Sequence, residues 1–203
     1  AGNRAAGRQG GEMRTFAVTA AALALLSGAA SAETLSVGRA ELAFPLPDGA
    51  QARPPLVLGK GQIHQYVGEK APAGEGREEV WAFVFDRSAI PDLKTAMTRA
   101  GEAFAINCAV APLLEPPRIA SEDGVPVGVA AMRCGRSAAH DGAEAGVLKA
   151  FAGKDGYFMV QRAVRLPAVA RSEDLAVPQA ELEREQALLA ATRLCEPGPC
   201  AGR

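Results

Sequence analysis

Val80-Trp81-Ala82-Phe83-Val84-Phe85 is a stretch rich in β-branched and aromatic residues that contains no charge and ends at Asp86. Such a run predicts a central β-strand that is covered on both faces. Trp81 is the only tryptophan of the chain. We expect it in the core; the alternative is a binding surface, where aromatic residues are enriched.

The residues after this strand change to helical spacing. Apolar side chains recur three and four positions apart between Ser88 and Ala105. This pattern predicts an amphipathic helix over about 90–105. Pro91 is tolerated in a first helical turn, and Asp86 or Ser88 would cap the helix by accepting hydrogen bonds from free backbone N–H groups.

Shorter strands are expected before the central strand. Residues Glu33–Phe44 alternate in period two with a slip at Gly38-Arg39, which we interpret as one bulged strand. Leu56–Leu58 and Gln62–Val67 predict two further strands. The segment Gly68–Glu79 is rich in Gly, Glu, Lys and Pro, and is expected to form a mobile hairpin loop.

Two hairpins are predicted after the helix, because Asp123-Gly124 and Gly153-Lys154-Asp155-Gly156 are turn sequences between apolar runs. The strands that these turns would join are 118–122 with 125–134, and 147–151 with 157–166. Arg162 and Arg165 lie on opposite faces of the last strand, so a shared anion clamp is not expected. Surface ion pairs are expected for both.

A final helix is predicted over about 178–194, with alanine and leucine side chains as its buried stripe and glutamates in its first turns. No internal repeat divides the chain. The predicted class is therefore α+β: a single domain with an antiparallel sheet of about five to seven strands, packed by one inserted helix and one carboxyl-terminal helix and stapled by disulfides.

Residues Met13–Ala32 resemble a cleaved export signal. Arg14 is followed by an apolar run over 16–26 and by small residues that end in Ala30-Ser31-Ala32. We expect cleavage after Ala32, a single periplasmic or secreted domain over 33–203, and an upstream artefact over 1–12. The apolar run is too short for a permanent membrane helix, and no later segment is longer, so no transmembrane segment is expected in the mature chain.

The charge of the chain excludes one class of partner. With 22 basic and 23 acidic side chains, the formal net charge is −1 and neither sign forms a long run. A nucleic-acid partner is therefore not expected, because such proteins carry a clear excess of basic residues. The same mixture argues against a polybasic membrane anchor.

Four cysteines become informative once export is accepted, because an oxidising compartment favours disulfides. Three pairings are possible. Pro197-Gly198 between Cys195 and Cys200 predicts a tight turn that brings these two together, which leaves Cys108 for Cys134. A redox-active pair is the alternative, but its usual spacing is two residues rather than four.

One loop holds Ser137, His140 and Asp141, which together suggest a hydrolase triad. Triad members normally come from separate elements, and no nucleophile-elbow glycines surround Ser137. We therefore make no catalytic assignment. Only two histidines are present and the cysteines are expected to be oxidised, so no metal and no cofactor is predicted.

The sequence favours a non-catalytic protein of the bacterial envelope that binds a protein or a small ligand, as an accessory or inhibitor does. The alternative is a periplasmic hydrolase that acts on envelope material through His140 and Asp141. A concave pocket in which His140 meets Ser137 or a carboxylate would favour the hydrolase. A flat, apolar sheet face that bears tyrosine would favour the binding protein.

Expression from Met13 in a bacterial host is expected to give a periplasmic product that begins at Glu33, because the export signal is removed after Ala32. Intact-mass measurement of the purified protein checks this. A cytoplasmic product that retains residues 13–32 contradicts the assignment.

Overall fold

The computed structural model describes residues 32–68, 78–196 and residue 200. The predicted export signal and most of the predicted loop over Gly68–Glu79 lie outside the described residues. Neither helix in the described part of the chain has the length and apolarity needed to cross a membrane.

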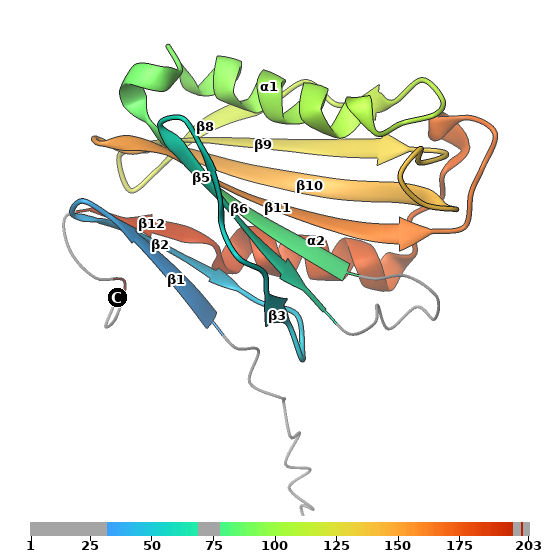
Figure 1. Ribbon diagram of the computed structural model, residues 1–203, viewed down its shortest axis with the longest axis horizontal. Helices are drawn as coiled ribbons and strands as arrows, with labels where there is room; N and C mark the ends of the chain where they lie inside the picture. The colour runs from blue at the N-terminus through green and yellow to red at the C-terminus, as the bar shows by residue number, and fades with distance from the viewer. Residues whose placement is uncertain (1–31, 69–77, 197–199, 201–203) are drawn as a thin grey trace, which may run out of the picture.

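The fold has three layers, with a large antiparallel sheet in the middle (Figure 1). Helix α1 covers one face of this sheet, and helix α2 lies on the other face together with a small sheet. The order of the large sheet is β3-β5-β6-β11-β10-β9-β7, with β4 paired to β5 and β8 paired to β9. The small sheet has the order β1-β2-β12. The predicted α+β class and single domain are confirmed.

The bounds of the elements follow from the backbone pairing. The large sheet contains β3 (Gln51–Ala52), β4 (Leu56–Leu58), β5 (Gly61–Val67), β6 (Glu78–Asp86), β7 (Leu113–Leu114), β8 (Arg118–Glu122), β9 (Val125–Cys134), β10 (Ala143–Ala152) and β11 (Gly156–Leu166). The small sheet contains β1 (Ala32–Val37), β2 (Ala40–Pro45) and β12 (Arg193–Cys195). The helices are α1 (Leu93–Ile106) and α2 (Gln179–Ala191), with 3₁₀ turns η1 (Arg87–Ala89) and η2 (Ser172–Asp174).

The described residues form more strands than the five to seven predicted. One reason is the segment Glu33–Phe44, which is a hairpin of β1 and β2 and not one bulged strand. Gly38 at its turn has φ 61, a left-handed conformation that glycine adopts without strain. The slip in the apolar pattern therefore marks a reversal of the chain. Very short pairings such as β3 and β7 add the remaining strands, and they are too brief to show a period in the sequence.

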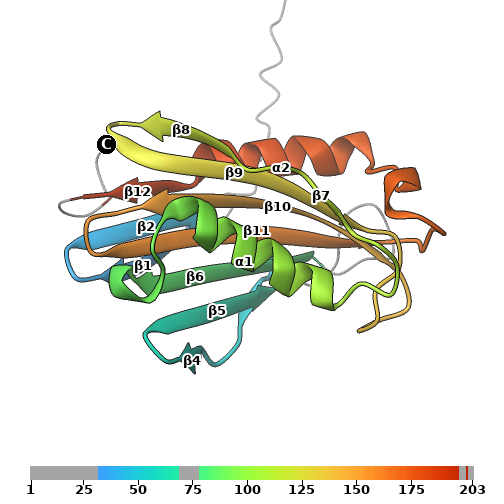
Figure 2. The same cartoon turned by 90° about the horizontal axis from the view of Figure 1, so that it is seen from above.

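Strand β6 is the predicted central strand, but its two faces are not covered equally. Val80, Ala82 and Val84 are buried beneath α2 and the small sheet. Trp81 and Phe83 point to the other face and are half-buried. The prediction that Trp81 lies in the core is wrong, because α1 crosses only part of this face and leaves β5 uncovered (Figure 2).

Helix α1 confirms the predicted amphipathic helix, although it starts later than expected. Its cap is Asp92, whose side chain accepts a hydrogen bond of 2.7 Å from the backbone N–H of Thr95. The predicted cap Asp86 instead accepts from Ser88 and holds the 3₁₀ turn η1. Gly128 of β9 lets the helix approach closely, because a Cβ there would overlap the sulfur of Met97.

Helix α2 ends at Ala191, earlier than predicted, because Arg193–Cys195 pairs with β2 as strand β12. The buried Lys149 of β10 stabilises this end. Its ammonium donates to the carbonyls of Leu189 and Thr192 at 2.7 and 2.9 Å. A cation at this position satisfies free carbonyls and complements the negative end of the helix dipole.

Arg162 contradicts the expectation of a surface ion pair, because it is only 1% exposed. Its Nε donates to Glu78 of β6 at 2.5 Å, and its Nη2 donates to Glu181 of α2 at 2.6 Å. Arg184 donates to the second oxygen of Glu181 at 3.0 Å. Burial alone would lower the pKa of Arg162, but the hydrogen bonds and charges of the two glutamates outweigh it and raise the pKa. The sequence shows where Arg162 points but not what covers it.

The two disulfides join the cysteines that the sequence paired. Cys108, just after α1, is bonded to Cys134 at the end of β9 with a Cα–Cα distance of 5.7 Å. Cys195 of β12 is bonded to Cys200 with a Cα–Cα distance of 5.3 Å. The first bond ties the end of the inserted helix to the large sheet, and the second closes a short ring on the small sheet.

Paired replacement of Cys108 and Cys134 by serine is expected to lower the free energy of unfolding by about 2 to 5 kcal/mol, because this bond constrains a long loop of the unfolded chain. The same change at Cys195 and Cys200 is expected to cost less than half as much, since the two positions are only 5 apart in sequence rather than 26. Urea unfolding of both double variants measures the difference. Equal losses would show that the carboxyl-terminal ring supports the core as much as the longer bond does.

Candidate functional site

A pocket of about 390 Å³ opens on the α1 side of the large sheet, beyond the carboxyl end of the helix. Its volume lies within the range of small-molecule sites. Its aromatic wall is made by Trp81, Phe83 and Phe104. The other lining residues are Ile63, Glu79, Ala103, Asn107, Ala139, His140, Glu144, Gln161, Ala163 and Arg165.

The register of three strands explains why these side chains meet. Glu144 of β10 lies opposite Arg165 of β11, and Gln161 of β11 lies opposite Trp81 of β6. Residues that lie opposite each other in an antiparallel pair point to the same face. The pocket is thus a patch of one sheet face that α1 leaves open.

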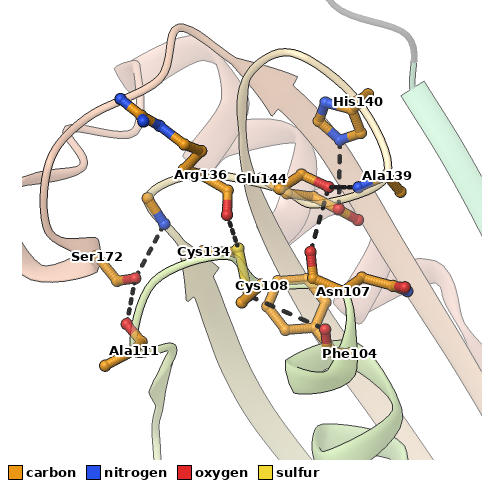
Figure 3. The surroundings of a disulfide bond; sticks show 12 residues. Phe104, Asn107, Cys108, Ala111, Cys134, Arg136, Ala139, His140, Glu144 and Ser172 are labelled. Carbon is orange, nitrogen blue, oxygen red and sulfur yellow. Dashed lines mark hydrogen bonds and ion pairs between the residues drawn. A yellow bond between two sulfur atoms is a disulfide. The ribbon is translucent and has the colours of Figure 1, made fainter.

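A clamp at the end of α1 holds the loop that carries His140 (Figure 3). Asn107 directly follows α1, and its carbonyl accepts from the backbone N–H of Ala138 at 2.7 Å and from Ser137 Oγ at 3.4 Å. Ser137 Oγ in turn accepts from the N–H of Ala139 at 3.1 Å. The Cys108–Cys134 bond fixes both sides of this clamp, so the disulfide positions one wall of the pocket.

His140 and Glu144 come together at the rim. His140 Nε2 is 3.5 Å from a carboxylate oxygen of Glu144, which is too far for a good hydrogen bond. This nitrogen has no hydrogen-bond partner among the described residues. Burial, and then the charge of Arg165, lowers the pKa of His140. Burial, and then the charge of Glu79, raises the pKa of Glu144. Near neutral pH the imidazole is therefore uncharged, and its buried Nε2 lies toward the carboxylate of Glu144.

The opposite rim carries a balanced pair of charges. Arg165 Nη2 donates to Glu79 at 2.9 Å, and Gln65 donates to the second oxygen of Glu79 at 3.1 Å. Arg165 is partly exposed, so the expected ion pair at the surface is found for this arginine. The charges of Arg165 and Glu79 therefore compensate each other.

The structure separates the three residues that the sequence singled out as a triad. Ser137 is buried and its hydroxyl is used by the clamp. Asp141 is exposed and does not line the pocket. Only His140 faces the pocket, and its carboxylate neighbour is Glu144.

Sequence reasoning did not single out Glu79, Glu144 or Arg165 as site residues. The alternation along β11 already places Arg165 on the face of Gln161 and Ala163. To bring Glu79, Glu144 and Arg165 together, the sequence would have had to show the strand register. It would also have had to show that β10 starts at Ala143, four residues before the predicted strand. Its first residues are alanine, glutamate and glycine, which do not show a strand pattern.

Metal binding has little support in this pocket. Within the described ranges, no group of three or more His, Cys, Asp or Glu side chains is arranged to hold a metal ion. The lining suits an organic ligand instead, because aromatic surface lies beside amide, imidazole and carboxylate groups.

Comparison with known proteins gives distant structural likenesses only. No protein-family model matches the sequence, and no curated protein matches it. The Ran-binding protein Mog1p of Saccharomyces cerevisiae is 11% identical with a TM-score of 0.46, over 80% of this chain and 95% of Mog1p. LpqN of Mycobacterium tuberculosis, a protein involved in cell envelope biogenesis, is 10% identical with a TM-score of 0.41, over 81% of this chain and 90% of LpqN.

The pKa of His140 is expected to lie below its usual value of 6.5. A lowered pKa means that the folded protein resists protonation, so the stability that His140 contributes is present above about pH 6.5 and is lost as the pH falls through the folded-state pKa. NMR titration of the imidazole and urea unfolding at about pH 7 and pH 5 measure both effects. His140→Gln should lose less stability over this interval than the wild type does. An imidazole that titrates above 6.5 would contradict the described environment.

Proposed function

We propose that this chain is an exported, disulfide-stabilised protein of the bacterial envelope that binds a small polar ligand in the pocket beside α1. The observation that carries the proposal is the pocket itself, in which an aromatic wall faces a rim of hydrogen-bonding groups. The two closed disulfides support export, because such bonds persist in oxidising compartments.

The character of the lining indicates the kind of ligand. Trp81 and Phe104 offer flat apolar surface, whereas Gln161, Asn107 and His140 offer neutral donors and acceptors. The charged residues Arg165 and Glu79 already neutralise each other. A molecule with one apolar face and several hydroxyl or amide groups, such as a saccharide unit of envelope material, matches this combination.

A non-catalytic role is favoured by what the pocket lacks. Among its described lining residues there is no Ser, Thr, Cys or Lys that could act as a nucleophile. Ser137 lies nearby, but its hydroxyl is engaged by backbone groups. Both tyrosines, Tyr66 and Tyr157, are buried, so they form no flat sheet face for a protein partner.

One observation favours the hydrolase alternative. His140 meets the carboxylate of Glu144 in a concave pocket, and an uncharged imidazole near neutral pH can act as a general base. Without a protein nucleophile, the reaction would have to use a water molecule that His140 activates. In this candidate function, His140→Ala abolishes turnover but leaves ligand binding largely intact.

Trp81 allows a direct test, because it is the only tryptophan and it lines the pocket. Titration with soluble peptidoglycan fragments is expected to change its fluorescence in a saturable way. Arg165→Gln should weaken binding by about tenfold, which corresponds to about 1.4 kcal/mol, because it leaves the carboxylate of Glu79 at the rim without its charged partner.

Arg118→Gln is the matched control, since the Arg118 side chain is 86% exposed on β8 and does not line the pocket beside α1. It should bind like the wild type. If no fragment changes the fluorescence of Trp81, the proposed ligand class is contradicted. If the wild type releases cleaved fragments and the His140→Ala variant does not, the protein is a hydrolase and not only a binding protein.

A further inference from the structure

Strand β8 forms one outer edge of the large sheet (Figure 2). It pairs with β9 on one side and, within the part of the chain that the structure describes, with no strand on the other. All of its residues, Arg118–Glu122, are exposed, and the apolar Ile119 is 50% exposed. An open strand edge presents unpaired backbone N–H and C=O groups, so another strand can extend the sheet at this edge.

The turn that joins β8 to β9 determines which backbone groups of β8 face outward. Asp123 and Gly124 have φ 50 and φ 81, which defines a two-residue type I′ turn whose flanking residues exchange hydrogen bonds. Every second residue counted back from Glu122 therefore bonds to β9. The N–H and C=O groups of Ile119 and Ser121 face the open edge.

Two features of β9 agree with this alternation. The N–H of Glu115 donates to the carbonyl of Ala131 at 2.9 Å, so the odd-numbered residues of β9 form their bonds toward this edge. Pro126 lies opposite Ser121 and has no N–H, as suits a position that does not bond to β8.

The charges of β8 make the strand complementary to itself. Arg118 and Glu122 stand at its two ends, and residues four apart in a strand point to the same face. When two copies of β8 pair antiparallel about Ala120, Arg118 of each copy lies opposite Glu122 of the other. Opposite charges in directly opposed positions stabilise a strand pair.

Contacts within the chain leave both charges accessible. The Arg118 side chain is 86% exposed, and its distance of 3.9 Å to Glu115 makes a surface pair that contributes little. Lys149 binds one oxygen of Glu122 at 2.8 Å, but the Glu122 side chain is still 51% exposed. A carboxylate accepts from several donors, so Glu122 can bind a second cation.

The backbone favours the same register as the charges. Pairing about Ala120 places Ile119 of one copy opposite Ser121 of the other, so the outward-facing residues exchange hydrogen bonds. A shift by two residues places either Ser121 opposite Pro117, which has no N–H, or Ile119 opposite Asp123, which belongs to the turn. A shift by one residue brings outward-facing groups opposite groups that already bond to β9.

The opposite edge of the sheet lacks this complementarity. Strand β4 (Leu56–Leu58) is also exposed there (Figure 2). It is flanked by Arg53 and Lys60, which are both basic, and it follows Pro54 and Pro55, which have no N–H. Pairing of β4 with itself would place cations near one another and would lose backbone donors.

We propose that the chain forms a two-fold symmetric dimer in which β8 of two copies pairs antiparallel about Ala120, so that the two large sheets become one. The Ile119 side chain lies on the α1 face, beside Met97 and above Gly128. In the dimer its counterpart is its diagonal neighbour, within reach of a long side chain. No residue of β8 lines the pocket beside α1, so the dimer does not depend on the ligand proposed there.

Sedimentation equilibrium of the chain from Glu33 is expected to show a reversible monomer–dimer equilibrium between about 1 µM and about 1 mM. A monomer throughout this range overturns the proposal. Species larger than a dimer overturn the two-fold arrangement, because a strand that pairs with its own copy closes the assembly at two chains.

Charge reversal locates the interface. Arg118→Glu is expected to weaken dimerisation by at least about tenfold, because it places like charges opposite each other at both ends of the paired strands. Arg53→Glu makes the same change of charge at the exposed opposite edge and should dimerise like the wild type. Equal effects of the two variants, or a larger effect of Arg53→Glu, contradict an interface at β8.

The backbone pairing is tested at Ser121. Ser121→Pro removes an N–H that faces the open edge and leaves the bonds to β9 in place, as proline at a sheet edge does. It should abolish the dimer, whereas Ser121→Ala should keep it. A folded Ser121→Pro variant that still dimerises rules out pairing along this edge.

A cross-link tests the register. Ala120→Cys should join two copies by a disulfide on mild oxidation, because directly opposed residues of an antiparallel pair lie within disulfide distance. Ser121→Cys should not, since Ser121 lies opposite Ile119. Mass spectrometry under non-reducing conditions identifies the linked peptides. Efficient linkage through position 121 instead of position 120 overturns the pairing about Ala120.

Discussion

The guanidinium of Arg162 lies inside the protein between two carboxylates from different layers, Glu78 of β6 and Glu181 of α2. A buried charge is tolerated only with such partners, and loss of one partner from a buried pair typically costs about 3 to 5 kcal/mol. The network therefore dictates where α2 sits on the sheet. The remaining residues of that layer, including Pro45 and Leu46, pack around a helix whose position is already determined.

The sequence predicted the elements that are determined by interactions between residues close together along the chain. The period of α1 and the Asp123-Gly124 turn were readable because each is determined by a few neighbouring residues. Long-range pairing was not readable. Strand β12, from the other end of the chain, completes the small sheet by pairing with β2, and Arg162 is covered by α2, which returns across the sheet.

The candidate site shows the same division. His140 could be found from the sequence, because histidine is rare in this chain. Its partners could not, since Glu144 and Arg165 meet through a strand register that the sequence does not specify. Ser137 and Asp141 drew attention by proximity along the chain, yet one is committed to the clamp below α1 and the other faces solvent. Closeness in sequence is a poor guide within a loop, where each residue points in its own direction.

Strands β6 and β11 place alternate side chains on the two faces of the large sheet. Glu78 and Val80 point to one side and Glu79 and Trp81 to the other, and β11 does the same with Arg162 against Gln161 and Arg165. An insertion or deletion of one residue within either strand would exchange these two sets. In evolution, single residues of these strands can therefore be substituted, but a change in strand length would alter the lining of both pockets, the one beside α1 and a second one between α2 and the segment after β2. A duplicated copy of the gene could alter one pocket by substitution while the other kept its shape.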